Sequence, residues 1–203
     1  TKLKDEGIFY VIIPDVMSNI ADFIVVDHVN HFTIRSIVRL MENNVFEVVD
    51  INIEAHSSAL IIIAKKKNIE DLAGLVKYPV ANDSDKIIVK RSKEMAIYWE
   101  GIKEKLEIFQ SKLSPEIKLA IYGSGFYGAY LMTNLINKEM VTCFIDRDPY
   151  RQAKKLFGCS IIDPDELPCG IDTILVGLNP VTAKENIAMI DSWRDRDLEF
   201  FYL

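Results

Sequence analysis

Short apolar runs alternate with polar and amphipathic stretches along the chain, and this pattern predicts an α/β fold. The first run, from Gly7 to Pro14, is apolar throughout, which is typical of a strand buried on both faces of a sheet and stopped by a proline. Thr33 is a good N-cap for a helix that continues to about Asn44, because apolar residues recur at helical spacing after it. The chain therefore begins with a strand, a polar segment and a helix.

Two further strands are expected next. Phe46 to Glu54 alternates between apolar and polar residues, Ala59 to Ala64 is continuously apolar, and the short turn between them predicts an antiparallel pair. Residues 1–67 thus have too few strands for a complete domain. Residues 68–91 are turn-rich, with one short helix expected at Ile69 to Val76, and form the best candidate for a connection between domains.

Residues 92–114 predict a long amphipathic helix, whose apolar residues recur at alternating spacings of four and three. These residues are Met95, Trp99, Ile102, Leu106, Phe109 and Leu113. The repeat is heptad-like but short, so packing of this helix on a neighbouring domain is favoured over a dimeric coiled coil, which stays open as the alternative.

Residues 115–203 alternate regularly between strands and helices, which predicts a five-stranded parallel sheet of order 3-2-1-4-5. The expected strands are Leu119–Tyr122, Val141–Ile145, Ser160–Ile162, Thr173–Leu178 and Leu198–Tyr202, and the expected helices are Phe126–Asn137, Tyr150–Leu156 and Val181–Trp193. A ligand crevice is expected outside the carboxyl ends of the strands, between Gly123 and Asn179.

The turn after the first of these strands carries the most specific motif of the chain, a G-x-G-x-x-G pattern formed by Gly123, Gly125 and Gly128. In such a turn the first glycine permits the sharp bend, the second lets the backbone approach a phosphate, and the third lets the helix pack close to the strand. Asp146 ends the next strand, where an acid that binds ribose is expected. A nucleotide cradle and a scaffold with an empty crevice both remain open, and Asn179 either donates to a ligand or simply starts a helix.

Two of the three histidines lie in the polar segment before the first helix, where Asp27 precedes His28 and His31 follows. A carboxylate beside an imidazole can orient it and raise its basicity, which suits a general base near neutral pH. A metal site formed by Asp27, His28 and His31, and a purely structural loop, are the alternatives.

Composition narrows the functional classes further. The chain has 203 residues, 49% of them hydrophobic, and a net charge of −6, which argues against nucleic acid as a partner. Neither a membrane-spanning run nor a signal peptide is evident, and three irregularly spaced cysteines favour a reducing, cytoplasmic compartment. The motifs of serine hydrolases and P-loop NTPases are absent from the sequence.

The first half of the chain resembles the C-terminal half of S-adenosylmethionine-dependent methyltransferases, with its strand, helix and closing antiparallel strand pair. The resemblance lies in three segments, Ile8-Phe-Tyr-Val-Ile-Ile-Pro-Asp15, Asp27-His28-Val-Asn-His-Phe-Thr33 and Phe46-Glu-Val-Val49. The second half is similar to the C-terminal Rossmann-like domain of multidomain sugar C-methyltransferases. The residues concerned are Tyr122-Gly-Ser-Gly-Phe-Tyr-Gly128, Phe144-Ile-Asp-Arg-Asp-Pro-Tyr-Arg-Gln152, Phe157-Gly158 and Pro164-Asp-Glu-Leu167.

This resemblance implies that His28 takes a proton next to a sugar carbonyl, so that the resulting enolate is methylated on carbon. The sequence departs from the family in two places: Asp27 replaces the usual Glu, and Arg151-Gln152-Ala153 replaces Lys-Gln-Gly. In the family, the strands that bind S-adenosylmethionine precede the segment that corresponds to Thr1. The chain is therefore expected to be an enzyme fragment that does not bind the donor alone and whose substrate is a nucleotide-linked sugar.

Two other functions remain open on the sequence. The chain could be a non-catalytic module that binds a nucleotide or nucleotide-sugar, or, with less support because no substrate domain is evident, an NAD-dependent oxidoreductase. In either case the incomplete first sheet predicts an exposed apolar strand edge and therefore self-association into a homo-oligomer.

Overall fold

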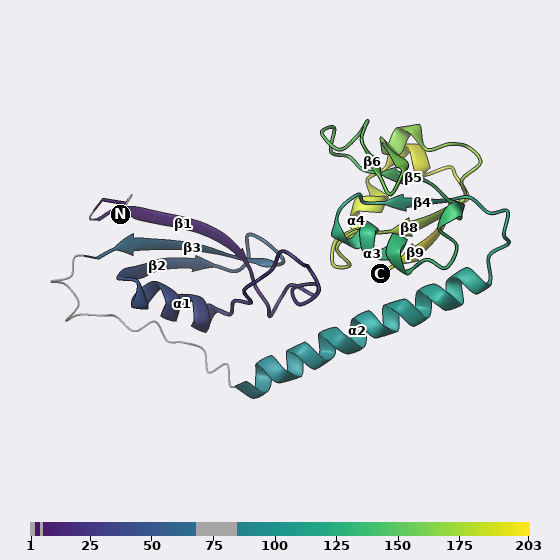
Figure 1. Cartoon of the computed structure of the whole chain (residues 1–203). Helices are drawn as coiled ribbons and strands as arrows, with labels where there is room; N and C mark the ends of the chain where they lie inside the picture. The colour runs from purple at the N-terminus through teal and green to yellow at the C-terminus, as the bar shows by residue number, and fades with distance from the viewer. Residues whose placement is uncertain (1–2, 5, 68–84) are drawn as a thin grey trace. The chain divides into compact units, whose positions relative to one another are not determined.

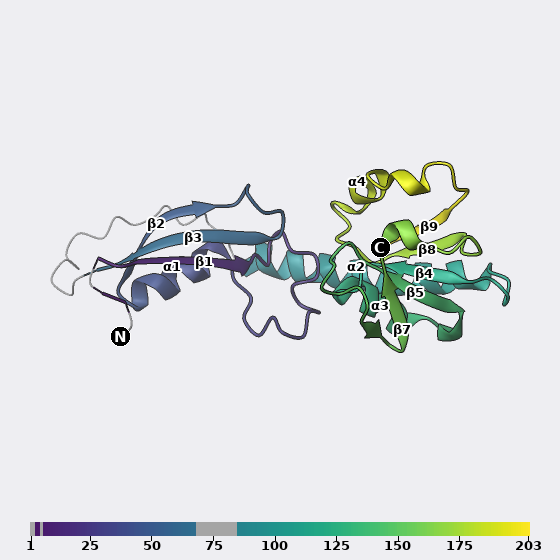
Figure 2. The same ribbon diagram turned by 90° about the horizontal axis from the view of Figure 1, so that it is seen from above.

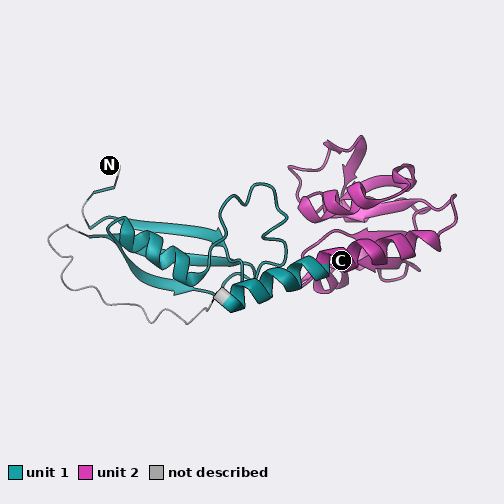
Figure 3. Ribbon diagram, turned by 60° about the horizontal axis from the view of Figure 1, so that its bottom comes forward, with its two compact units in different colours: residues 1–98 teal, residues 99–203 magenta. Residues whose placement is uncertain are grey.

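The computed structural model describes residues 3, 4, 6–67 and 85–203. The chain divides into two compact units, residues 1–98 and 99–203 (Figure 3), and each is described by itself below. The division falls inside the long helix α2, Asp85–Ser111, which begins earlier than the sequence indicated. The short helix expected at Ile69 to Val76 lies outside the described residues.

Unit 1 is a three-stranded antiparallel sheet with one helix on one face (Figures 1 and 2). Strands β1 (Ile8–Pro14), β2 (Phe46–Asn52) and β3 (Ala59–Lys66) lie in the order β1-β3-β2, and the expected antiparallel pairing of β2 with β3 is confirmed. Because β3 is antiparallel to both neighbours, β1 and β2 run in the same direction.

Helix α1 (Ile34–Asn43) starts where the sequence indicated. The Thr33 hydroxyl accepts from the amide of Ser36, and the Ser36 hydroxyl accepts from the amide of Thr33, so each side chain satisfies a donor that the first turn leaves unpaired. The buried face of α1 packs on alternate residues of the sheet. This core contains Ile37, Val38, Met41, Val48, Leu60, Ile62 and Ala64.

Strand β1 is one of the two edges of this sheet, and the expectation that it is buried on both faces is wrong. The amide of Lys66 donates to the carbonyl of Gly7 at 2.9 Å, so the odd-numbered residues of β1 point their backbone groups towards β3 and the even-numbered ones away from it. The side chains of Ile8, Tyr10 and Ile12 lie on the face away from α1 and are 67%, 57% and 54% exposed. Unit 1 therefore has an apolar strip, formed by Ile8, Tyr10 and Ile12, that its described residues leave exposed.

Unit 2 contains a six-stranded sheet of order β6-β7-β5-β4-β8-β9, one strand more than expected. All neighbours are parallel except β6 and β7, which form an antiparallel hairpin. The strands are β4 (Leu119–Tyr122), β5 (Val141–Ile145), β6 (Lys155–Leu156), β7 (Cys159–Ile162), β8 (Thr173–Val176) and β9 (Glu199–Tyr202).

Helices cover both faces of this sheet. One face packs against helix α3 (Phe126–Asn134) and the part of α2 that begins at Trp99, with Leu106 and Leu131 in a common core with Phe144. The other face packs against helix α4 (Ala183–Ala188) and short 3-10 turns. These turns are η3 (Pro164–Glu166) and η4 (Asp191–Trp193), and a third, η2 (Lys138–Met140), leads into β5. The long amphipathic helix thus packs on a domain, as favoured from its spacing.

Two expected helices are corrected by the structure. Tyr150 to Leu156 is not a helix, because the chain turns there and Lys155–Leu156 pairs with β7 through the two-residue turn Phe157-Gly158. Both turn residues have positive φ, 51° and 84°, as hairpin turns of this length require. Val181 to Trp193 is interrupted after Ala188, because the chain turns inward at Ile190 and buries Trp193, whose indole donates to the carbonyl of Pro164 at 2.9 Å.

Candidate functional site

The segment between β1 and α1 is a structured loop. The carboxylate of Asp15 accepts from the amide of Met17 at 3.1 Å and from the hydroxyl of Ser18 at 2.8 Å, which fixes the turn that leaves β1. At the other end, the amide of Val16 donates to the carbonyl of Phe32 at 3.0 Å. The two ends of the loop are therefore held together.

The side chain of Asp22 lies at the centre of this loop and is completely buried. Its two oxygens contact two imidazoles: Nδ1 of His28 lies 3.0 Å from Oδ1, and Nδ1 of His31 lies 2.6 Å from Oδ2. A buried carboxylate needs such partners, because without them its desolvation is costly. With Nδ1 of each ring donating to Asp22, the Nε2 atoms are left as proton acceptors in the neutral rings.

The two imidazoles remain partly accessible, with 21% of the His28 side chain and 36% of the His31 side chain exposed. The ring of His31 also contacts Phe23, with centroids 4.6 Å apart. A partly exposed histidine that is oriented through Nδ1 is arranged as a general base usually is.

The orienting carboxylate is Asp22 and not Asp27, which the sequence paired with His28. Asp27 is exposed and makes no hydrogen bond or ion pair to His28 within the described residues. Sequence reasoning missed Asp22 because it precedes His28 by six positions in a loop without periodicity. The available signal was a single acid inside the otherwise apolar run Ala21-Asp-Phe-Ile-Val25.

The metal alternative receives no support from the arrangement of side chains. Within residues 3, 4, 6–67 and 85–203, no group of three or more His, Cys, Asp or Glu residues is placed to hold a metal ion.

The glycine turn of unit 2 has the geometry that the motif indicated. Gly123 has a φ of 103°, and a Cβ on it would lie 2.2 Å from the carbonyl oxygen of Gly177. A Cβ on Gly128 would lie 1.8 Å from the carbonyl oxygen of Gly123. The first and third glycines are therefore required for the close approach of β4, α3 and the end of β8.

Gly125 differs from its two neighbours in the motif. A Cβ on it would meet only the guanidinium of Arg151, at an ordinary 3.5 Å. That guanidinium lies 3.3 Å from the hydroxyl of Ser124 and 3.5 Å from the carboxylate of Asp148. The space beside the second glycine, where a phosphate would approach, is thus next to a positively charged side chain.

Asp146 is already engaged by the glycine turn. Its Oδ2 accepts from the amide of Ser124 at 2.9 Å and from the Ser124 hydroxyl at 2.5 Å, and its Oδ1 accepts from the amide of Asp148 at 3.0 Å. Burial by itself would raise the pKa of Asp146, but these hydrogen bonds and the charge of Arg151 outweigh burial and lower it. The carboxylate of Asp146 therefore stabilises the glycine turn. A ribose hydroxyl could bind Asp146 in the usual way only by replacing its hydrogen bonds to Ser124 or Asp148.

Asn179 follows β8, and its side chain accepts from the amide of Val181 at 3.0 Å. This contact forms the turn that leads to α4. It agrees with the alternative that Asn179 helps to start a helix. Phe126 and Tyr127, at the start of α3, pack against Trp99, with ring centroids 6.4 Å and 6.1 Å from its own. The structure brings Asp146 to the glycine turn, whereas His28 belongs to the other unit.

The amino-acid sequence matches no protein-family model and no curated protein. Among the described residues, no helix has both the length and the apolar character needed to cross a membrane.

Proposed function

We propose that this chain is the C-terminal portion of an S-adenosylmethionine-dependent C-methyltransferase that acts on a nucleotide-linked sugar, and that His28 is its general base. The observation that carries the proposal is the contact of the buried Asp22 carboxylate with Nδ1 of His28, which leaves Nε2 as the proton acceptor. Asp22 is the positioning residue.

The proton transfer follows from this geometry. Nε2 of His28 takes a proton from the carbon next to the substrate carbonyl, and the electron pair of the broken C–H bond forms an enolate. The imidazolium that results is stabilised by Asp22, which lies in a buried environment where charge interactions are strong. When bound, S-adenosylmethionine supplies the methyl group that this reaction class transfers to carbon.

Two contacts in the glycine turn support placing donor binding elsewhere. The carboxylate that would bind a ribose, Asp146, is bonded to Ser124, and the guanidinium of Arg151 lies beside Gly125. The proposal therefore assigns donor binding to a part of the enzyme outside this chain, so that this chain alone has no methyltransferase activity.

The arrangement of unit 1 supports the same proposal. Strand β3 runs antiparallel between β1 and β2, which are parallel to each other, and this agrees with the closing strands of a methyltransferase sheet. The exposed side chains of Ile8, Tyr10 and Ile12 form the face that the remainder of such a domain, or a second copy in a homo-oligomer, would cover.

The test uses the full product of the reading frame that contains Thr1, a keto form of a nucleotide-sugar, and heavy water. Incorporation of deuterium next to the carbonyl, followed by mass spectrometry, reports proton abstraction without methyl transfer. We expect His28→Asn to slow this exchange by about 100-fold or more and His56→Asn, at the third histidine of the sequence, to leave it unchanged. Exchange that persists in His28→Asn, or an upstream frame without a donor-binding domain, contradicts the proposal.

A second candidate is a non-catalytic module that binds a nucleotide or nucleotide-sugar. One observation favours it: the glycine turn lies at the carboxyl end of β4, and the only side-chain atom near a Cβ on Gly125 belongs to the guanidinium of Arg151. A phosphate could approach the backbone there. Calorimetric titration of this chain with a nucleotide-sugar, S-adenosylmethionine and NAD separates the candidates. Binding of S-adenosylmethionine to the chain alone contradicts the fragment proposal, and binding of NAD favours an oxidoreductase over both candidates.

A further inference from the structure

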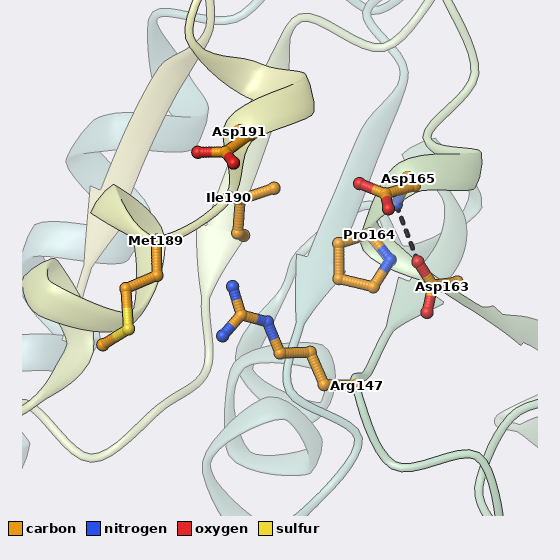
Figure 4. Close-up of a pocket in the computed structure, with 7 residues that line it drawn as sticks. All are labelled: Arg147, Asp163, Pro164, Asp165, Met189, Ile190 and Asp191. Atoms are coloured by element: carbon orange, nitrogen blue, oxygen red, sulfur yellow. Dashed lines mark hydrogen bonds between the residues drawn. The ribbon is translucent and has the colours of Figure 1, made fainter.

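Unit 2 contains a pocket of about 370 Å³ at the carboxyl edge of its sheet, separate from the glycine turn (Figure 4). Arg147 follows β5, Asp163 and Asp165 follow β7, and the turn after α4 closes the opposite side. This volume lies at the lower end of the range for small-molecule sites, about 300–1,000 Å³. None of these residues was a candidate from the sequence.

The guanidinium of Arg147 points into the pocket, towards Ile190 (Figure 4). Within the part of the chain that the structure describes, no carboxylate oxygen lies within 4.0 Å of this guanidinium and it donates no hydrogen bond. An arginine presents five donors in a rigid fork. The pocket therefore offers unused donors to the acceptor atoms of a ligand.

Three carboxylates line the same pocket, and each has only part of its acceptor capacity in use. Asp163 accepts from the side chain of Gln152 and from the amide of Asp165, both at 2.9 Å. Asp165 accepts from the hydroxyl of Ser192 at 2.6 Å, and Asp191 pairs with Arg194 at 2.7 Å. Since a carboxylate has about four lone-pair sites, acceptors remain available for the donors of a ligand.

The balance of charge decides which ligands fit. One guanidinium lies beside three carboxylates, and one of these, Asp191, is paired with Arg194, so the lining keeps a net negative charge. A phosphate or carboxylate would gain the attraction of Arg147 and meet the repulsion of Asp163 and Asp165. A cation would be attracted by the carboxylates, but it would be repelled by Arg147 and could not accept the hydrogen bonds that this side chain donates. A neutral molecule with several hydroxyl groups avoids both penalties, because each hydroxyl can accept from Arg147 and donate to an aspartate.

The remaining walls suit the same class of molecule. Pro164 and Ile190 are buried and Met189 is exposed, so one side of the pocket is apolar. Apolar carbon faces beside hydroxyl-binding groups are what a sugar ring or another cyclic polyol requires.

We infer that the pocket around Arg147 binds a neutral, hydroxyl-rich ligand, with Arg147 as the donor and Asp163, Asp165 and Asp191 as the acceptors. The inference concerns unit 2 alone and does not depend on the role of His28. It names a site that is distinct from the glycine turn, whose nearest guanidinium is that of Arg151.

The test is a titration of the full 203-residue chain, followed by two-dimensional NMR of backbone amides and arginine side chains. The probes are methyl α-D-glucopyranoside, myo-inositol and inorganic phosphate. We expect at least one neutral probe to shift the signals of Arg147 and Ile190 with a dissociation constant of about 10 mM or lower, and phosphate to bind these residues more weakly. No shift at Arg147 with either neutral probe up to about 50 mM, or tighter binding of phosphate there, overturns the inference.

Variants assign the effect to the pocket. Arg147→Gln should weaken binding of the neutral probe by about tenfold, while Arg39→Gln, at an exposed arginine in unit 1, should leave it unchanged. Asp165→Asn should weaken binding of the neutral probe and strengthen that of phosphate, because it removes one negative charge. Equal affinity of the wild-type chain and Arg147→Gln for the neutral probes overturns the inference, provided that the amide spectrum shows the variant to be folded.

Discussion

The side chain of Asp22 lies 2.6 Å from Nδ1 of His31, and it is completely buried. The second oxygen of the same carboxylate contacts His28 at 3.0 Å, so one acid orients both imidazoles. This shared contact fixes which ring nitrogen of each histidine faces outward. The orientation of both rings is thereby set by a residue that solvent does not reach.

Replacing Asp22 with Asn should make the two histidines inequivalent. The amide oxygen can still accept from one Nδ1, but the amide NH2 must face the other, which then has to carry its proton on Nε2. We expect one histidine to change tautomer, observed in the ¹⁵N shifts of the ring nitrogens, and a loss of stability of about 1.5–3 kcal/mol. Asp27→Asn is the control, and unchanged tautomers in Asp22→Asn would show that the carboxylate does not orient the rings.

Three glycine-to-alanine substitutions should have different effects on thermal unfolding. Gly128→Ala places a Cβ 1.8 Å from a backbone oxygen, so the helix must move, at a cost of about 3 kcal/mol or more. The new Cβ of Gly125→Ala would meet only the guanidinium of Arg151. Because Gly125 is the N-cap of α3 and Ala is a poorer N-cap residue, the substitution should lower the free energy of unfolding by no more than about 1 kcal/mol.

Gly101→Ala completes this series. Nothing lies within 4 Å of a Cβ on Gly101, and the residue lies inside α2, so the substitution should stabilise by about 0.5–1 kcal/mol. Equal destabilisation by all three substitutions would contradict the packing described for the glycine turn.

Asp146 should make the stability of unit 2 depend on pH in the acid range. Its pKa is lowered in the folded state, so its contribution is present above the ordinary value of about 4 and is lost as the pH falls through the folded value. Asp146→Asn should therefore lower the urea midpoint at pH 7 and reduce its further fall in acid. The exposed Asp195→Asn serves as the control, and a parallel acid profile for wild type and Asp146→Asn would count against this role.

The three cysteines should differ in reactivity. Burial, with a smaller effect from Cys159, raises the pKa of Cys143 to about 11, so that at pH 8 only about one thiol in a thousand is ionised. Cys169 is exposed and should be alkylated by iodoacetamide first, as peptide mass spectrometry would show. Cys169→Ser should remove the rapid phase, and the label should reach Cys143 only after unfolding. Rapid native labelling of Cys143 would be inconsistent with its burial.

The elements that the sequence predicted well are those with local causes. The capping pair of Thr33 and Ser36 starts α1, and Gly123 and Gly128 produce the turn between β4 and α3, because each acts through neighbours a few positions away. The hairpin at β6 was missed because its pairing with β7 and the positive φ of Phe157 override a pattern compatible with a short helix.

The candidate site was less predictable for the same reason. The contact of Asp22 with His28 spans six positions of an irregular loop, and the contact of Ser124 with Asp146 spans 22 positions between two strands. Neither leaves a periodic signal in the sequence. Asp146 fits the position of a ribose-binding acid, and its use to close the glycine turn is visible only once β4 and β5 lie side by side.

The hairpin of β6 and β7 also has a consequence for solubility. A parallel sheet that ended at β7 would present a row of unpaired backbone groups on which a strand of another molecule could add. Instead its last strand has two residues, one of them Lys155, and is followed at once by the tight turn Phe157-Gly158. Because this edge strand is short and charged, it is a poor template for aggregation. The turn Phe157-Gly158, which the sequence pattern did not predict, therefore protects this end of the sheet against the addition of strands from other molecules.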